Sequence, residues 1–334
     1  MSWQALLYPL SCVYKEAVDV RLTLYRRSIL KTRSLPCRVI SVGNLTLGGS
    51  GKTPVVAFLG SMLRDCGKKV AVLSRGYRGQ WESRVNLVSD GHQIYLNAYT
   101  AGDEPVMLAQ KLPGVFILSG KNRYRTGTFA CNNFSIEVAI MDDGYQHLAL
   151  GRDLNILLLD EEALAPQSRL FPAGRLREPI KNVARADIVL YNGDNDIKGR
   201  LEALGFRGQV SPFCLQASYI LDLRKGVKKE LSVLRGQKVL ALSGIAHPHR
   251  FHEMLEQLGA KVRILSFPDH HRFRPGDYRK LAEETKDQDI IVTTEKDAVR
   301  LNPDLMPGCH IYALGVAVDL GKSFSEFQSL VLKF

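Results

Sequence analysis

The sequence lacks the cysteine patterns that mark zinc sites and disulfide scaffolds. Its six cysteines are scattered over 334 residues, with no Cys-x-x-Cys pair. This distribution favours a reduced compartment and argues against a structural zinc site. The chain also lacks an apolar run of the about 18–20 residues that a membrane-spanning helix needs. Its first residues lack a basic leader followed by an apolar core and a cleavage site. We therefore expect a cytoplasmic protein whose contact with any membrane is peripheral.

Acidic residues are in the minority. Lys and Arg number 45 against 34 Asp and Glu, which gives a net charge of +11 and a pI near 9.4. Such a balance favours an anionic partner, namely a nucleotide, a nucleic acid or an acidic membrane surface. The basic residues are spread along the chain, and no RNP-like, zinc-finger or helix-turn-helix pattern is present. We therefore expect no nucleic-acid partner.

Residues 1–35 differ from the rest of the chain. Apolar residues recur there at helical spacing, which predicts one stripe of a helix. The stripe consists of Trp3, Leu6, Leu7, Leu10, Val13, Tyr14, Ala17 and Val18. Seven basic and two acidic residues lie within positions 1–38. Such a helix can lie on an anionic membrane, but the pattern fits equally well a helix packed on the protein with a solvated basic side.

From residue 38 onward, short apolar runs alternate with helical stretches. The first runs are RVISVGN, KKVAVLSRG, GVFILSG, EVAIMDDG, LNILLLD and ADIVLYNG. Runs rich in Val, Ile and Leu are typical of buried parallel strands in an α/β sheet. A second series follows, with KVLALSGIA, KVRILSFPDH, DQDIIVTTEKD and HIYALGV. Between the two series, near residues 210–235, the sequence favours a connector of paired strands.

The chain is therefore predicted to be an α/β protein with two α/β/α sandwich domains joined by a two-stranded hinge. The first has a P-loop-NTPase-like parallel sheet, and the second is smaller and Rossmann-like. The predicted boundaries place the basic helix at 1–35, the first domain at 36–209, the hinge at 210–235 and the second domain at 236–334. The last helix of the second domain can return to the first.

The stretch GNLTLGGSGKTP lies between the first predicted strand and the following helix. It matches the P-loop pattern at Gly51, Lys52 and Thr53, but Thr46 occupies the position of the first glycine. Backbone N–H groups of such a loop bind phosphate oxygens at the positive end of the helix, Lys52 reaches the β- and γ-phosphates, and the Thr53 hydroxyl binds Mg²⁺. The alternative is an ordinary glycine-rich turn. The predicted nucleotide site consists of Thr46, Leu47, Gly48, Gly49, Ser50, Gly51, Lys52 and Thr53.

A second element supports nucleotide binding. The predicted strand at residues 138–141 ends in Asp142 and Asp143. P-loop enzymes use an acid at the tip of a neighbouring strand to hold Mg²⁺, often through water. Alone, a strand that ends in Asp-Asp fits a turn or a helix cap. Together with the Gly-Lys-Thr motif it favours a metal site, although the sequence does not distinguish which carboxylate touches the ion.

Several motifs jointly resemble one family. In chain order they are SVGNLTLGGSGKTP, LSRGY, AGDEP, DDGYQH, RDLNILLLD, LFPAGRLREP, LSGIA and FPDHHRF, and they span nearly the whole chain. On these motifs the chain resembles the tetraacyldisaccharide 4′-kinases of lipid A biosynthesis. The resemblance implies that the γ-phosphoryl group of ATP moves, with Mg²⁺, to the 4′-hydroxyl of tetraacyldisaccharide 1-phosphate to give lipid IVA. It also implies work at the cytoplasmic face of the bacterial inner membrane, and a P-loop in which threonine replaces the first glycine.

The resemblance also implies roles for single residues. Asp103 matches the general base and His270 its partner, so the second domain would close over the first. Arg177 could bind phosphate or offset transition-state charge. The full candidate set is Asp103, His270, Asp143 and Arg177 for catalysis, and Thr53, Asp142 and Glu178 for the metal. The TTEKD stretch at residues 293–297 resembles the base-recognition loops of GTPases, which places Lys296 beside the nucleotide. Arg75 and Tyr77 are further candidates on the substrate side.

Each of these residues also has a purely structural interpretation. Asp103 begins a good helix-start pattern and could be an N-cap, His270 could lie on a solvated loop, and Arg177 with Glu178 could form a surface ion pair. His147 is predicted to be structural. The HPHRFH stretch, with His247, His249 and His252, is predicted to be a helix start rather than a metal site, because no acid or cysteine completes it.

The expected partners are the lipid substrate and an anionic membrane surface, and the protein is expected to be a monomer. The lipid acceptor raises the expectation that residues 1–35 touch the membrane. Two alternatives stay open at this point. One is a P-loop kinase for a soluble metabolite, and the other is a regulatory P-loop NTPase that hydrolyses nucleotide without an acceptor.

Overall fold

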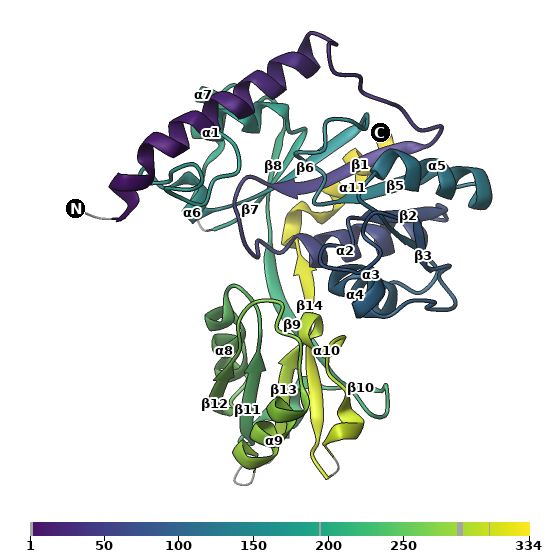
Figure 1. Cartoon of the computed structure of the whole chain (residues 1–334), viewed down its shortest axis with the longest axis vertical. Coiled ribbons are helices and arrows are strands. Elements are labelled where there is room, and N and C mark those ends of the chain that lie inside the picture. The colour runs from purple at the N-terminus through teal and green to yellow at the C-terminus, as the bar shows by residue number, and fades with distance from the viewer. Residues whose placement is uncertain (1–2, 194, 286–289, 307) are drawn as a thin grey trace.

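The computed structural model describes residues 3–193, 195–285, 290–306 and 308–334, with side chains from residue 6 onward (Figure 1). Part of two sequence predictions lies outside these residues, namely the Trp3 side chain of the apolar stripe and positions 287–289 of one predicted strand. Within the described part, two β-sheets carry the fold, each with helices on its faces. This confirms the predicted α/β class with two parallel-dominated sheets.

The first sheet has eight strands in the part of the chain that the structure describes. They are β1 (Arg38–Asn44), β2 (Val70–Ser74), β3 (Asn86–Ser89), β4 (Phe116–Ser119), β5 (Val138–Asp142), β6 (Leu154–Asp160), β7 (Ile188–Asn192) and β8 (Gln209–Pro212). Their order is β3-β4-β2-β5-β1-β6-β7-β8, and only the β3–β4 pair is antiparallel. Since β1 lies between β5 and β6, the carboxyl ends of these three strands meet at one edge, where ligands of open α/β sheets bind.

Helices cover both faces of this sheet because its strands are apolar on both sides. Along β1, Ile40 and Val42 join the core beneath α2 (Lys52–Asp65), whereas Val39 joins the core beneath α5 (Arg123–Phe134). The first face also carries α4 (Asp103–Lys111), which follows the short α3 (Ala98–Ala101) in the chain. The second face carries α6 (Glu161–Leu164), η1 (Ile180–Arg185) and α7 (Lys198–Ala203).

The second sheet has six strands in the described residues. They are β9 (Cys214–Asp222), β10 (Lys228–Lys229), β11 (Lys238–Ser243), β12 (Lys261–Ser266), β13 (Ile290–Thr294) and β14 (Ile311–Asp319), in the order β10-β9-β14-β13-β11-β12. Around it lie η2 (Leu231–Leu234), α8 (Pro248–Gln257), α9 (Pro275–Glu284), α10 (Glu295–Ala298) and η3 (Pro303–Leu305). The pairs from β14 to β12 are parallel, as in a Rossmann-like sheet.

The chain crosses between the two sheets along one antiparallel pair of strands. β9 and β14 pair over their full length, from Tyr312 opposite Asp222 to Asp319 opposite Cys214. Figure 1 shows this ribbon joining the two parts of the molecule. Beyond β14, η4 (Gly321–Ser323) leads into α11 (Phe324–Lys333), which packs on α2 of the first domain with Phe327 fully buried. Of the two connecting strands, β9 lies within the predicted hinge at residues 210–235, whereas β14 lies outside it, in a run that was predicted as a strand of the second domain.

An N-terminal helix, α1 (Trp3–Arg26), lies across the first domain (Figure 1). Leu22 is buried, the Ser11 hydroxyl donates to the Leu170 carbonyl at 2.9 Å, and the Tyr14 hydroxyl donates to the Arg177 carbonyl at 2.8 Å. No helix among the described residues is long and apolar enough to span a bilayer.

Candidate active site

The glycine-rich loop lies where β1 ends and α2 begins. Gly48 and Gly51 have φ angles of 107° and 83°, in the left-handed region that favours glycine. The Lys52 ammonium donates to Asn44 Oδ1 at 3.1 Å and lies 3.6 Å from Asp143 Oδ1. The loop therefore has the strand–loop–helix context that a P-loop requires, with Lys52 turned back over it.

The first half of the loop is held in an extended form, which explains how threonine replaces glycine at position 46. Thr46 is buried and forms an antiparallel bridge with Leu176. The Leu47 N–H donates to the Arg175 carbonyl at 2.7 Å. An extended residue has negative φ, so position 46 does not need the freedom of glycine. The segment 172–179 thus acts as an outer support of the loop.

Asp142 and Asp143 stand at the end of β5, beside the loop, in different electrostatic surroundings. Burial, with the nearby carboxylates of Glu104 and Asp143, raises the pKa of Asp142 to about 7. Burial alone would raise the pKa of Asp143 as well, but the charges of Lys52 and Arg177 lower it. Arg177 Nη1 lies 2.8 Å from Asp143 Oδ2, so these residues form one ion-pair group with Lys52.

The surroundings of Asp142 fit a magnesium ligand. Its carboxylate is buried, accepts from the Ser74 hydroxyl at 3.2 Å, and forms no salt bridge within the described residues. A buried carboxylate without a cationic partner suits a hard cation, and Mg²⁺ usually takes one or two carboxylates, with water and phosphate oxygens completing its shell. The described residues contain no group of three or more Asp, Glu, His or Cys side chains that could by themselves hold a metal ion.

Glu178 does not join this group. Its buried carboxylate accepts from Asn182 Nδ2 at 2.9 Å and pairs with Arg185. Those partners lie on η1, and no contact links Glu178 to Asp142 or Asp143. Burial raises the pKa of Glu178, with Arg185 opposing that shift. We therefore leave Glu178 out of the metal site and assign it to the support of segment 172–179.

Asp103 and His270 meet across the two domains, as the family resemblance implies. Asp103 begins α4, His270 follows β12, and the two are 167 positions apart, yet His270 Nδ1 lies 2.9 Å from Asp103 Oδ2. Only 12–13% of either side chain is exposed. Lys296 Nζ lies 3.2 Å from His270 Nε2. Because an ammonium only donates, Nε2 accepts, and Nδ1 therefore carries the proton that is donated to Asp103.

Other contacts also join the two domains. Lys111 of α4 pairs with Glu295 of α10 at 2.5 Å, and Tyr219 of β9 donates to the same carboxylate at 2.8 Å. The Tyr77 ring lies 5.8 Å from the His270 ring, edge to face. Arg75, which directly follows β2, pairs instead with Glu82 of its own domain.

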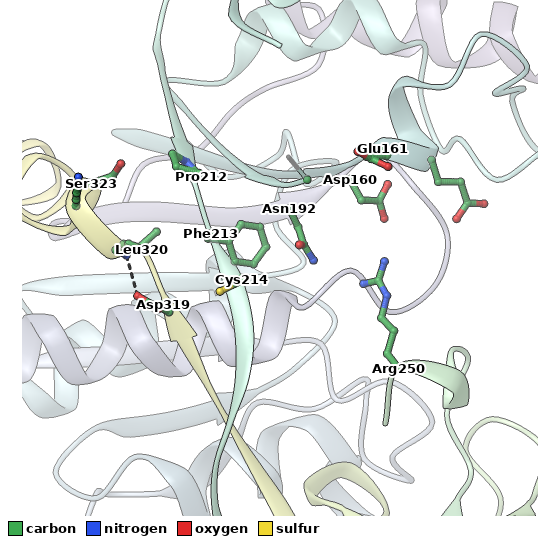
Figure 2. Close-up of a pocket in the computed structure, with 14 residues that line it drawn as sticks. Asp160, Glu161, Asn192, Pro212, Phe213, Cys214, Arg250, Asp319, Leu320 and Ser323 are labelled. Carbon is green, nitrogen blue, oxygen red and sulfur yellow. Dashed lines mark hydrogen bonds between the residues drawn. The ribbon is translucent and has the colours of Figure 1, made fainter. Parts of the chain in front are cut away.

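A hollow of about 640 Å³ opens on the other side of the P-loop, at the carboxyl ends of β6 and β7 (Figure 2). Asn192 ends β7, Phe213 follows β8, and Arg250 of α8 reaches in from the second domain toward Asp160. The hollow begins one residue from a neighbour of the P-loop: Cys214 lines it, and a Cβ at Gly51 would lie 3.0 Å from Cδ1 of the next residue, Leu215. This hollow was not predicted from the sequence, although Asp160 and Asn192 at the ends of two predicted strands were visible signals.

The remaining predicted residues lie as follows. His147 is half-buried, and burial with the charge of Arg123 lowers its pKa to about 4. His249 is exposed, while His252 is buried and contacts Ser243. His247 lies against Arg175 instead of facing a metal. The three histidines therefore form no metal site among the described residues.

Comparisons with known proteins agree over nearly the whole chain. A family model described as tetraacyldisaccharide-1-P 4′-kinase matches residues 3–333. The tetraacyldisaccharide 4′-kinase of Syntrophus aciditrophicus is 39% identical, covering 98% of this chain and 93% of that protein. The one from Geobacter metallireducens is 40% identical, covering 95% and 94%. A crystal structure of the "apo" form of LpxK from Aquifex aeolicus in complex with ATP superposes with a TM-score of 0.81 at 34% identity, over 99% of this chain and 98% of that one.

Proposed function

The chain belongs to the tetraacyldisaccharide-1-P 4′-kinase family, and from that premise we propose how its two domains carry out phosphoryl transfer. It is an ATP-dependent lipid A kinase, which moves the γ-phosphoryl group to the 4′-hydroxyl of tetraacyldisaccharide 1-phosphate. The observation that carries the mechanism is the contact of Asp103 with His270, because it joins one acid and one histidine of separate domains near the P-loop.

The triphosphate lies along the P-loop, with its γ-end toward Asp142 and Asp103. Asp142, the proposed metal ligand, ends β5, and Asp103, the proposed base, begins α4. Both elements lie on one side of β1. The nucleoside must then extend to the opposite side, toward β6 and β7. There the hollow of about 640 Å³ has room for a base and a ribose, and the Asn192 amide can both donate to and accept from a base edge.

Thr53 and Asp142 would hold Mg²⁺. Bound there, the ion would neutralise charge that develops on the phosphate oxygens. Lys52 and Arg177 add two fixed positive charges, which Asp143 orients through its contacts with both. Such preorganised charges stabilise the transition state without reorganising during the reaction.

Asp103 is the proposed base that accepts the proton of the 4′-hydroxyl. Its Oδ2 is occupied by His270 Nδ1–H and faces Arg300 Nε at 3.6 Å, which leaves Oδ1 for the substrate. His270 already carries its proton on Nδ1, so in this arrangement it orients the carboxylate and does not receive the proton. The new bond joins the 4′-oxygen to the γ-phosphorus as the bond from that phosphorus to the β,γ-bridging oxygen of ATP breaks, and ADP leaves.

The α1 helix is the proposed contact with the membrane, at the cytoplasmic face of the inner membrane. Leu6, Leu10 and Val13 follow one another on one face of α1 and are 69%, 56% and 68% exposed. The neighbouring side of the helix is anchored by Ser11 and Tyr14, as described above, so the predicted apolar stripe is divided between Tyr14, which contacts the first domain, and the exposed Leu6, Leu10 and Val13. An apolar stripe left open beside basic residues suits an acylated substrate in an anionic leaflet.

Transfer of labelled γ-phosphate from Mg·ATP to tetraacyldisaccharide 1-phosphate in detergent micelles tests the proposal. Labelled lipid should form with the wild type and with Lys121→Ala, an exposed-lysine control, and should vanish with Lys52→Ala. Hydrolysis of ATP without labelled lipid would favour the regulatory NTPase. Equal labelling by Lys52→Ala would remove the P-loop from the mechanism.

A further inference from the structure

One side chain from each domain holds the tip of the P-loop. Arg175, from the support segment, lies on one side, and its Nη2 donates to the Leu47 carbonyl at 2.7 Å. His247, which precedes α8 of the second domain, comes from the other side, with Nε2 only 2.6 Å from the same Nη2. The two domains therefore touch at the loop itself, away from the Asp103–His270 contact.

The protonation of this pair follows from chemistry. A guanidinium has five donors and no acceptor, so His247 Nε2 must accept and the imidazole must be neutral. The charged and titratable groups around His247 are Arg175, Arg250, Glu162 and His249, and burial and the two arginines favour the neutral form. The contact is thus a directed hydrogen bond from Arg175 to His247.

The guanidinium of Arg175 connects three parts of the protein. Nη1 pairs with Glu162 of α6 at 2.6 Å, and Nε and Nη2 both donate to the Leu47 carbonyl. The remaining contact is the one to His247. Arg175 is therefore fixed relative to the first sheet by Glu162 and relative to the second domain by His247.

Because Gly48 has no side chain, the Arg175 and His247 side chains can occupy the space beside it. A Cβ at position 48 would lie 2.5 Å from Arg175 Nη2 and 3.1 Å from His247 Nε2. A side chain there would displace the pair. Gly49 is also close, since a Cβ there would lie 3.8 Å from His247 Cδ2. Both glycines carry N–H groups of the phosphate loop, so the pair lies next to the groups whose direction decides phosphate binding.

We propose that His247 is a positioning residue, which couples the docking of the second domain to the shape of the phosphate loop by accepting a hydrogen bond from Arg175. This inference rests on the proposed function, since it assumes that the loop binds the phosphates of ATP. The loop holds its phosphate-binding form only while the second domain is docked. Phosphate binding and assembly of the Asp103–His270 pair therefore occur together.

Steady-state kinetics with MgATP and the micellar lipid tests this coupling. His247→Ala and Arg175→Ala should each lower kcat/KM for ATP about tenfold, the size of one lost polar contact. The double variant should be no worse than Arg175→Ala, because His247 acts through Arg175. The control is His92→Ala, because the His92 side chain is exposed and takes no part in the contact between Arg175 and His247. This variant should match the wild type.

Conservative variants separate positioning from mere support of the fold. His247→Gln can still accept from Arg175 and should recover most of the activity, whereas His247→Leu fills the space without an acceptor and should not. Thermal unfolding of each variant checks that the protein is folded. Equal activity of His247→Leu and His247→Gln, or multiplied losses in the double variant, would overturn the coupling. If the wild type labels no lipid at all, the proposed function itself fails instead.

Discussion

Glu295 carries one of the polar links between the two domains, and its substitution by glutamine gives a demanding test. One carboxylate oxygen pairs with Lys111 at 2.5 Å and the other accepts from Tyr219 at 2.8 Å. The Lys111 and Glu295 side chains are only 15% and 13% exposed, so solvent screens the pair weakly. Glutamine keeps the size of the side chain but removes its charge. The Lys111 ammonium only donates, so it cannot accept a hydrogen bond from the glutamine N–H₂ group.

The expected cost comes from the lost charge-assisted hydrogen bond and from the missing counter-charge of Lys111, which keeps its 2.7 Å hydrogen bond to the Val316 carbonyl. Hydrogen bonds to charged groups contribute about 1.5–3 kcal/mol. We therefore expect the free energy of unfolding to fall by about 2 kcal/mol. The same contact docks α4 on the second domain. Since Asp103 is the first residue of α4, its contact with His270 should also loosen. We expect kcat for lipid phosphorylation to fall about tenfold, which corresponds to about 1.4 kcal/mol.

Urea denaturation followed by circular dichroism, together with the phosphate-transfer assay, measures both effects. Glu326→Gln on the exposed surface of α11 is the matched control. Adding Lys111→Met to Glu295→Gln should restore part of the stability, because the unpaired charge is removed. Unchanged stability and kcat in Glu295→Gln would refute the reasoning that this ion pair docks the domains.

Three further predictions follow from the site and the helix. Asn192→Ala should raise KM for ATP about tenfold and leave KM for the lipid unchanged, as measured by initial rates; an unchanged KM for ATP would remove the hollow from nucleotide binding. Leu10→Ser with Val13→Ser should weaken binding to anionic vesicles at least tenfold in a sedimentation assay, since burial of one such side chain contributes about 1.5–3 kcal/mol; unchanged binding would contradict membrane contact by α1. His147 has its folded pKa lowered to about 4 from 6.5. Its contribution to stability is therefore intact above pH 6.5 and is lost as the pH falls toward 4. His147→Gln should flatten that part of the stability profile in urea titrations at stepped pH, and an unchanged profile would exclude His147 as its source.

The strands of both sheets were predictable where they are buried on both faces. β1, β5 and β6 are continuous apolar runs, because parallel strands covered by helices have no solvent side. β3 was missed, and the residues of β8 were assigned to the paired-strand connector instead of the first sheet. Both are four-residue edge strands with polar members such as Asn86 and Gln209. Their pairing depends on neighbours in space, which local patterns do not encode.

The residues of the candidate site also differ in whether the sequence predicts them. The P-loop and the two acids after β5 were predictable because each is one short stretch with its own chemistry. The Asp103–His270 pair required the family resemblance, since the docking of two domains brings it together. The Arg175–His247 contact had no local signal at all. Neither residue has a motif that points to the other, and 72 positions separate them.

We propose that Asp103 and His270 complete the catalytic site across the domain interface, where His270 Nδ1 lies 2.9 Å from Asp103 Oδ2. A double-mutant cycle with Asp103→Asn, His270→Ala and the pair tests it most directly, with kcat for lipid phosphorylation and the Kd for MgATP measured on each. We expect Asp103→Asn to lower kcat by about 10²–10⁴ with little change in Kd, as for a positioned base. The double variant should be no slower than Asp103→Asn. Near-normal turnover of Asp103→Asn, or losses that multiply in the double variant, would contradict the claim.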